Sequence, residues 1–278
     1  MEPDKARSGR SPEHTVVQLG HLLDSDTPRS LTATPYEHHL TSWHAPFAGP
    51  GTAIGEDTVT SATDAIAIGC HTGTHVDSLS HIARGGRAFD GTDIRLPGRQ
   101  SDAGGVRLEH GVELHPVVAR GILLDFPGLL GRERITADSR LTPDDIESCA
   151  RWAGVEIGPG DAVLIRTGWD TLVGDLDRFT AAPLPGPDLD AARYLSARRV
   201  SVVGSDTMPF EAAPDDEPLA VHAELLVDHG IQILEMLDLR ELARRRAYEF
   251  TFVMAPLRIV GGTGSPVNPL ALLDGGSA

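Results

Sequence analysis

The stretch His71-Thr72-Gly73-Thr74-His75-Val76-Asp77-Ser78-Leu79-Ser80-His81 brings three histidines and one aspartate into eleven residues. Imidazole and carboxylate groups are ligands that suit Zn²⁺ or Mn²⁺. In a fully extended strand His71 and His75 would lie about 13 Å apart, too far to share one ion. The chain must therefore turn between them, and Gly73 permits the turn. We predict a metal centre here, with His75 and Asp77 projecting side by side from one short extended piece.

A polar loop is the alternative interpretation of this stretch, because a single histidine is more often structural than a ligand. The density of histidine in this stretch favours a metal site over a polar loop. Three protein ligands leave an open position for water, which is the pattern of a catalytic site.

The composition excludes several classes of function. The formal net charge is −16, from 40 acidic and 24 basic residues, which argues against nucleic acid and anionic membranes as partners. Lys5 is the only lysine and lies in a polar terminal stretch, so Schiff-base chemistry is excluded. Two cysteines, Cys70 and Cys149, suit a reducing compartment, and no apolar run is long enough to span a membrane. We therefore expect a cytoplasmic protein.

The order of apolar runs predicts one α/β domain. Residues 1–13 are polar and are expected to form a disordered tail, and residues 14–278 to form the domain. Residues 24–59 and 84–111 are expected as loops, and residues 259–269 as turns. Strands are expected over residues 15–23, 64–70, 119–126, 161–167, 200–204, 231–235 and 248–253, with residues 64–70 buried. Helices are expected over residues 142–153, 188–198, 219–227 and 239–245.

The histidine-rich stretch resembles the His-x-Gly-Thr-His-x-Asp-x-Pro-x-His signature of the cyclase family, which includes bacterial kynurenine formamidases, isatin hydrolases and proteins named as polyketide cyclases. Further stretches fit the same family. They are residues 160–169 (GDAVLIRTGW), 204–207 (GSDT), 221–226 (VHAELL), 233–235 (ILE) and 262–266 (GTGSP). The resemblance extends from about residue 15 to 272. It implies a swivelling β/β/α-type layered fold with mixed sheets, and a homodimer or homotetramer.

The resemblance also implies roles for individual residues. It implies that His71, His75 and Asp77 bind the metal and that His81 acts as an acid/base beside it. In formamidase-like members a second ion is held partly by a later histidine and glutamate, which match His222 and Glu235. Members that resemble isatin hydrolase hold one Mn²⁺ instead, so one or two Zn²⁺ or Mn²⁺ ions are expected. Glu235 is a candidate ligand or a second base.

One position departs from the signature, because Leu79 stands where the family has proline. Proline would stiffen the approach to His81, so the placement of that histidine rests on other contacts. The predicted activity is hydrolysis of an amide, lactam or formamide C–N bond in a small, aromatic or cyclic substrate. A lactone hydrolase or polyketide-type cyclase on the same metal is one alternative, and a non-catalytic metal- or ligand-binding protein is another.

Overall fold

The apolar runs of the sequence form the centre of a nine-stranded mixed sheet. The computed structural model describes residues 14–29, 33–46, 54–55, 57–109, 114–214 and 217–274, so the predicted tail over residues 1–13 lies outside the described part. The strand order is β1-β15-β13-β7-β9-β11-β12-β4-β14. Pairing is parallel among β7, β9, β11 and β12, and antiparallel on both sides of them. The predicted single-domain α/β fold with mixed sheets is confirmed.

The large sheet is built from β1 (His14–Gln18), β4 (His75–Asp77), β7 (Val117–Asp125), β9 (Ala162–Arg166), β11 (Val202–Ser205), β12 (Gln232–Glu235), β13 (Glu249–Met254), β14 (Gly264–Pro266) and β15 (Leu270–Asp274). Three two-stranded pairs stand apart from it. They are β2 (Glu37–Pro46) with β3 (Thr60–Ala67), β5 (Gln100–Ser101) with β6 (Gly105–Val106), and β8 (Arg140–Leu141) with β10 (Gly186–Pro187).

The helical elements are α1 (Phe126–Leu130), α2 (Pro143–Ala153), the 3₁₀ turn η1 (Trp169–Leu172), α3 (Leu176–Phe179), α4 (Leu189–Ala197), α5 (Ala220–His222), the π-helix η2 (Ala223–Asp228) and α6 (Arg240–Arg245). The predicted start of α2 is confirmed. Thr142 accepts a hydrogen bond from the Asp145 amide, and the Asp145 carboxylate accepts one from the Thr142 amide.

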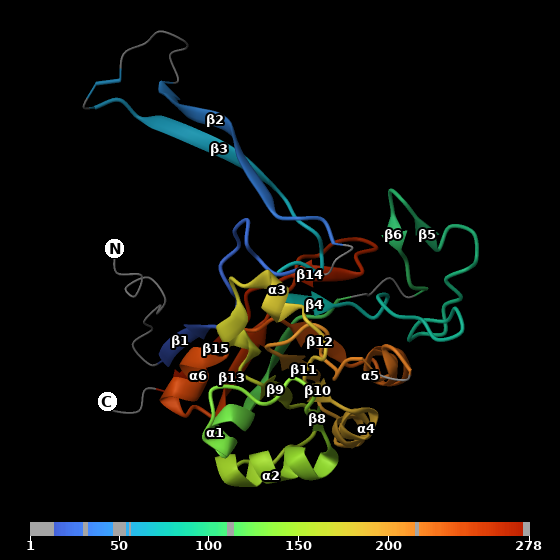
Figure 1. Cartoon of the computed structure of the whole chain (residues 1–278). Coiled ribbons are helices and arrows are strands. Elements are labelled where there is room, and N and C mark those ends of the chain that lie inside the picture. The colour runs from blue at the N-terminus through green and yellow to red at the C-terminus, as the bar shows by residue number, and fades with distance from the viewer. Residues whose placement is uncertain are drawn as a thin grey trace.

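The central strands are buried on both faces, as parallel strands usually are. Ile122 and Leu124 of β7 face one core cluster with Ile146 of α2 and Leu195 of α4. Leu123, the residue between them, faces a second cluster that includes Leu242 of α6. Figure 1 shows α2, α4 and α5 gathered on one side of the sheet. This alternation explains why the strands could be predicted from compact apolar runs.

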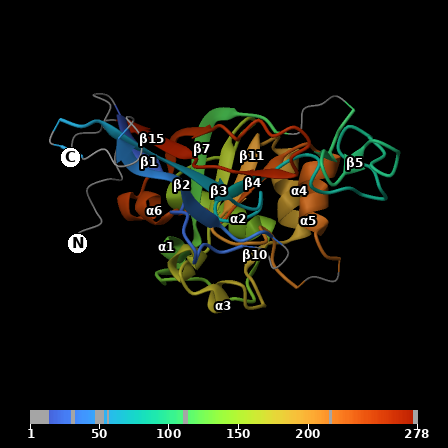
Figure 2. The ribbon, with the colours of Figure 1, turned by 90° about the horizontal axis from the view of Figure 1, so that it is seen from above.

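The largest correction concerns the region predicted as loops over residues 24–59. Ten of its residues form β2, which pairs with β3 in an antiparallel hairpin. Figure 1 shows the hairpin reaching away from the large sheet, and in Figure 2, seen from above, it lies in front of that sheet. Its side chains are polar or mixed, so no apolar alternation signalled a half-buried strand. The two strands pair only with each other among the described strands.

The buried strand predicted over residues 64–70 is also wrong. β3 ends at Ala67 and is mostly exposed, and a short irregular segment separates it from His71. Two further strands were missed near the C-terminal end. β14 lies inside the predicted turn over residues 259–269, and β15 follows that turn. The helix predicted over residues 219–227 exists, but most of it is the π-helix η2. In the described part of the chain no helix has the length and apolar character to cross a membrane.

Candidate metal centre

The short strand β4 carries two of the predicted ligands. Because side chains alternate along a strand, His75 and Asp77 point to the same face. β4 lies between β12 and β14, and its pairing with β12 sets His75 directly opposite Glu235. Directly opposed residues of an antiparallel pair share a face, so the register brings Glu235 to the same place. Three candidate ligands thus meet through strand pairing alone.

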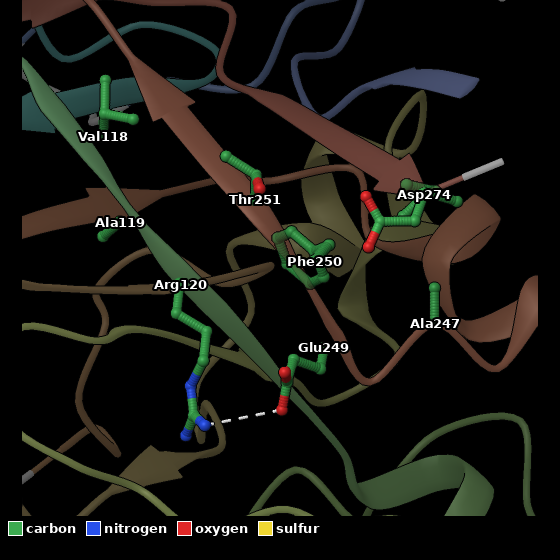
Figure 3. Close-up of a pocket in the computed structure, with 9 residues that line it drawn as sticks. Val118, Ala119, Arg120, Ala247, Glu249, Phe250, Thr251 and Asp274 are labelled. Atoms are coloured by element: carbon green, nitrogen blue, oxygen red, sulfur yellow. Dashed lines mark ion pairs between the residues drawn. The ribbon is translucent and has the colours of Figure 1, made fainter. Parts of the chain in front are cut away.

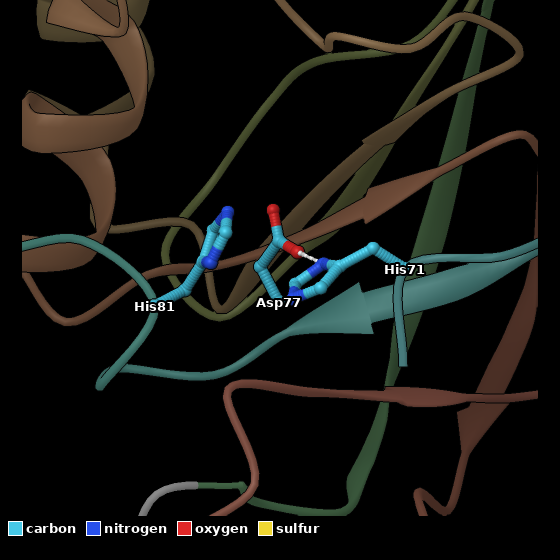
Figure 4. Close-up of side chains that lie close together, drawn as sticks. All are labelled: His71, Asp77 and His81. Atoms are coloured by element: carbon cyan, nitrogen blue, oxygen red, sulfur yellow. Dashed lines mark ion pairs between the residues drawn. The ribbon is translucent and has the colours of Figure 1, made fainter. Parts of the chain in front are cut away.

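The predicted turn at Gly73 is present. Gly73 has a φ of +63°, in the left-handed region that favours glycine. Its carbonyl accepts a hydrogen bond from Nδ1 of His75 at 2.8 Å, which directs Nε2 of that ring to the carboxylates of Asp77 and Glu235. The turn also returns His71 to the site, where its Nδ1 lies 2.8 Å from Oδ1 of Asp77 (Figure 4).

His222 reaches the same place from the junction of α5 and η2. Its Nε2 lies 3.2 Å from Oε1 of Glu235 and 3.4 Å from Oδ2 of Asp77. Nε2 of His75 lies 3.5 Å from Oδ1 of Asp77 and 3.5 Å from Oε2 of Glu235. These four side chains are each 5% exposed or less. The structure therefore assembles a buried group of two imidazoles and two carboxylates, with His71 at its edge.

The residues present fit a divalent cation. Nε2 of His75 and both carboxylate oxygens of Asp77 are buried and have no hydrogen-bond partner within the described residues. Although Asp77 is close to His71, the two groups are not aligned for a hydrogen bond. Buried polar atoms without partners are rare and costly, and a bound cation would satisfy all three.

The donors fall into two overlapping sets that share one carboxylate. His75, Asp77 and Glu235 form one set, and His71, Asp77 and His81 form the other. Within each set the ligand atoms lie within 4.8 Å of one another. A carboxylate has two oxygens and can bridge two cations. The arrangement therefore has donors for one ion and for a second beside it.

His81 lies against His71 at the edge of this group. Their ring centroids are 4.2 Å apart, and the His81 ring is 6.3 Å from that of His222 (Figure 4 shows His81 beside Asp77 and His71). The turn before His81 closes without the proline of the family signature. The amide of His81 donates to the Ser78 carbonyl at 3.0 Å, and Leu79 is buried in a core cluster. Ser80 adds a hydrogen bond to the Gly262 carbonyl.

Burial and charge set the protonation of the site. Burial would raise the pKa of Asp77, but interactions with His222, His71 and His75 hold it well below its usual range, so the carboxylate is ionised. Burial lowers the pKa of His81 to about 4 although Asp77 opposes this, so its imidazole is neutral at pH 7.

Two supporting groups were not anticipated from the sequence. Nδ1 of His222 is hydrogen-bonded to Oε2 of Glu211, a carboxylate that is only 4% exposed. Nε2 of His71 is 3.1 Å from the hydroxyl of Thr263. Next to it, Gly264 leaves room for His71, because a Cβ at that position would lie 2.8 Å from the ring.

Thr74 connects the segments that surround the centre. Its hydroxyl donates to the carbonyl of Met236, the residue after Glu235, and accepts from the amide of His21. Met236 is fully buried and has a φ of +54°, an uncommon conformation for a residue with a side chain. The hydroxyl of Thr74 therefore helps to hold the end of β12 against β4.

The comparisons with known proteins agree with this architecture. The family model described as "Putative cyclase" matches residues 17–212. The chain belongs to the cyclase family. Isatin hydrolase of Roseibium aggregatum is 29% identical over 214 residues, which cover 74% of this chain and 73% of that protein. Kynurenine formamidase of Salinibacter ruber is 27% identical over 220 residues, 77% of this chain and 81% of that protein.

Solved structures of cyclase-family proteins are similar over almost the whole chain. A structure described as a novel cyclase has a TM-score of 0.78 and 28% identity, and the match covers 92% of this chain and 86% of that one. An isatin hydrolase bound to the product analogue thioisatinate has a TM-score of 0.68 and 27% identity, with 93% and 92% covered. The named relatives of this cyclase-family chain are thus hydrolases.

The structure brings all six predicted site residues into one place: His71, His75, Asp77, His81, His222 and Glu235. A separate open groove of about 680 Å³ lies on the antiparallel part of the sheet. Figure 3 shows its lining of Arg120 and Glu249, an ion pair at 3.5 Å, with Phe250 and Thr251. No ligand-bearing element lines it, so the groove is not part of the candidate centre.

Replacing Thr74 by valine should destabilise the protein without changing the volume of the side chain much. The Met236 carbonyl and the His21 amide would lose their hydroxyl partner, which costs about 1–3 kcal/mol per unsatisfied buried group. We expect the free energy of unfolding, measured by urea denaturation, to be lower in the variant by an amount of this size. Thr74→Ser keeps the hydroxyl and is the matched control. Equal stability of Thr74→Val and the parent would contradict the role assigned to this hydroxyl.

Proposed function

We propose that this cyclase-family protein is a metal-dependent hydrolase that opens the C–N bond of a small amide, lactam or formamide. The observation that carries the proposal is the set of buried, unpartnered ligand atoms on His75 and Asp77, with Glu235 and His222 beside them. The hydrolase names of the relatives support the reaction class. An aromatic or cyclic substrate is proposed from the same names.

The metal would be held by Asp77 and Glu235 together with His71, His75 and His222. A divalent ion bound there supplies a Lewis acid that polarises a carbonyl group and acidifies water. We propose Zn²⁺ or Mn²⁺, because imidazole and carboxylate ligands suit both. A second ion beside the first is the alternative, and it would take His81 as a ligand in place of the acid/base role.

The proton transfers are assigned to His81. Its ring is neutral at pH 7 because burial lowers its pKa to about 4, so an imidazole nitrogen can accept a proton from the attacking water. The same nitrogen then returns the proton to the leaving nitrogen of the substrate. While His81 holds the proton, the ionised Asp77 beside it stabilises the imidazolium form. Glu235 is proposed as a ligand, with a second-base role as the alternative.

We also propose that the chain forms a homodimer or homotetramer through the β2–β3 hairpin. A two-stranded hairpin is marginally stable alone in water, and this one pairs with no other described strand. Leu40, Trp43 and Ile66 on it are 40%, 74% and 58% exposed. Residues 34–70 carry four acidic residues and no lysine or arginine, so charged residues are sparse in this segment.

Removal of the metal should abolish hydrolysis. The purified protein would be tested against N-formylkynurenine, isatin, a simple lactone and an aryl amide, before and after chelation and after return of Zn²⁺ or Mn²⁺. We expect metal-dependent turnover of a C–N substrate. Turnover of the lactone alone would favour the alternative reaction, and bound stoichiometric metal without any turnover would favour a binding protein. Full activity of the chelated protein would contradict metal dependence.

Replacing His81 by alanine should separate catalysis from metal binding. Loss of a general acid/base lowers turnover by about 10²- to 10⁴-fold, while the set formed by His75, Asp77 and Glu235 keeps its donors. We expect the variant to retain metal, measured by elemental analysis, and to lose turnover. His229→Ala, at a histidine whose side chain is 44% exposed and lies outside the centre and the hairpin, is the control and should keep both. If His81→Ala keeps full activity, the acid/base assignment is wrong.

Polar substitutions on the hairpin should lower the mass of the particle in solution. The change combines Leu40→Lys, Trp43→Ser and Ile66→Lys, which removes its exposed apolar side chains. Light scattering after size exclusion should give an oligomer for the parent and a monomer for the variant. Val260→Ser removes an apolar side chain that is 71% exposed outside the hairpin and is the control. A monomeric parent, or an unchanged mass of the variant, would refute this interface.

A further inference from the structure

Glu211 is a buried carboxylate outside the predicted ligand set. It lies between β11 and α5 and is 4% exposed. A carboxylate is almost never buried without a partner, because removal from water is costly. The partner of Glu211 is Nδ1 of His222, which hydrogen-bonds to Oε2.

The contact decides which nitrogen of His222 faces the centre. An ionised carboxylate only accepts hydrogen bonds, so Nδ1 of His222 carries the proton and donates it to Glu211. The other nitrogen, Nε2, hydrogen-bonds Oε1 of Glu235 at 3.2 Å and lies 3.4 Å from Oδ2 of Asp77, so it is the nitrogen at which a metal would replace a proton. Glu211 therefore fixes both the orientation of the ring and the nitrogen that is presented to a metal.

The backbone around Glu211 is held firmly in place. The amide of Phe210 donates to Oε1 of Glu235 at 2.8 Å, and the amide of Ala212 donates to the Pro187 carbonyl. Gly186 on β10 lies so close that a Cβ there would approach the Phe210 carbonyl oxygen to 2.4 Å. One segment thus supports two candidate ligands, Glu235 through an amide and His222 through a carboxylate.

We propose that Glu211 is a positioning residue for the metal centre, acting through His222. It keeps Nε2 of His222 directed at Asp77 and Glu235. Its negative charge also makes that nitrogen more basic, and so a stronger ligand for a metal ion. The inference rests on the proposed metal centre. It adds that the affinity for metal depends on a residue that never touches the ion.

The chain offers a matched control in Glu224. This glutamate is also partly buried and also bonds a histidine, since its Oε1 lies 3.0 Å from Nε2 of His229. It belongs to η2, two residues after His222, and its hydrogen-bond and ion-pair partners among the described residues are Ser196, His229 and Arg193, none of which is a candidate ligand. Loss of its charge tests the general effect of removing a carboxylate near the site.

The experiment measures the affinity of the full-length protein for Zn²⁺ by competition with a chromophoric chelator. Glu211→Ala should weaken binding by about 10- to 100-fold, the usual effect of losing such a supporting group. Glu211→Gln keeps the shape and an acceptor oxygen but lacks the charge, so it should fall between Glu211→Ala and the parent. Glu224→Gln should bind as the parent does. Circular dichroism and urea unfolding of the metal-free variants confirm that each is folded.

A proton NMR spectrum of the Zn²⁺ form provides a second readout, which a change in packing alone would not alter. The Nδ1 proton of His222 should resonate far downfield in the parent and move upfield in Glu211→Gln, because the neutral amide is a weaker acceptor. Parent-like affinity in folded Glu211→Ala, or an unmoved proton in Glu211→Gln, would overturn the inference. Failure of the parent itself to bind Zn²⁺ or Mn²⁺ would instead refute the proposed function.

Discussion

The antiparallel pairing of β4 with β12, in the register that opposes His75 and Glu235, is the constraint on which the site depends. A shift of one residue would turn Glu235 to the other face of the sheet and separate it from Asp77. The register is strongly specified because Val76 and Leu234 are also paired, and both are fully buried in the same core cluster. Packing on one face of the strand pair therefore fixes the chemistry on the other.

The loops that follow the parallel strands support this pairing. The carboxylate of Asp206, after β11, accepts hydrogen bonds from the amides of Thr167 and Gly168, after β9. The backbone of Thr207 then accepts from the amide of Met236, after β12. Three stretches that resemble the cyclase family in sequence are thus joined at one end of the sheet. The segment carrying Glu211 extends from the same junction.

The sequence predicted those parts of the fold and site whose signal is local. Compact apolar runs located β7, β9 and β12, and Thr142 located the start of α2. The hairpin was missed because exposed strands have no buried face to produce alternation. His222 and Glu235 could be named only through family resemblance, since long-range strand pairing leaves no spacing in the sequence.

Glu211 left a weaker signal that was overlooked. It is a single charge within the short apolar run MPFEAAP, residues 208–214, and a charge in such a setting usually has a buried partner. Nothing local identifies that partner as His222. The structure supplies the identity, because the segment after β11 and the junction of α5 with η2 come together only in the folded chain.

The position of β4 within the sheet has a consequence for the order of events during synthesis. Thr74 and its partner Met236 are 162 residues apart, and β14, on the other side of β4, is further along the chain. A chain that leaves the ribosome from its N-terminus exposes His71 and His75 long before the strands that enclose them exist. The complete donor set forms only after β12 has been made. Tight loading of the proposed metal centre would therefore be a late event in maturation, after the C-terminal strands have been placed.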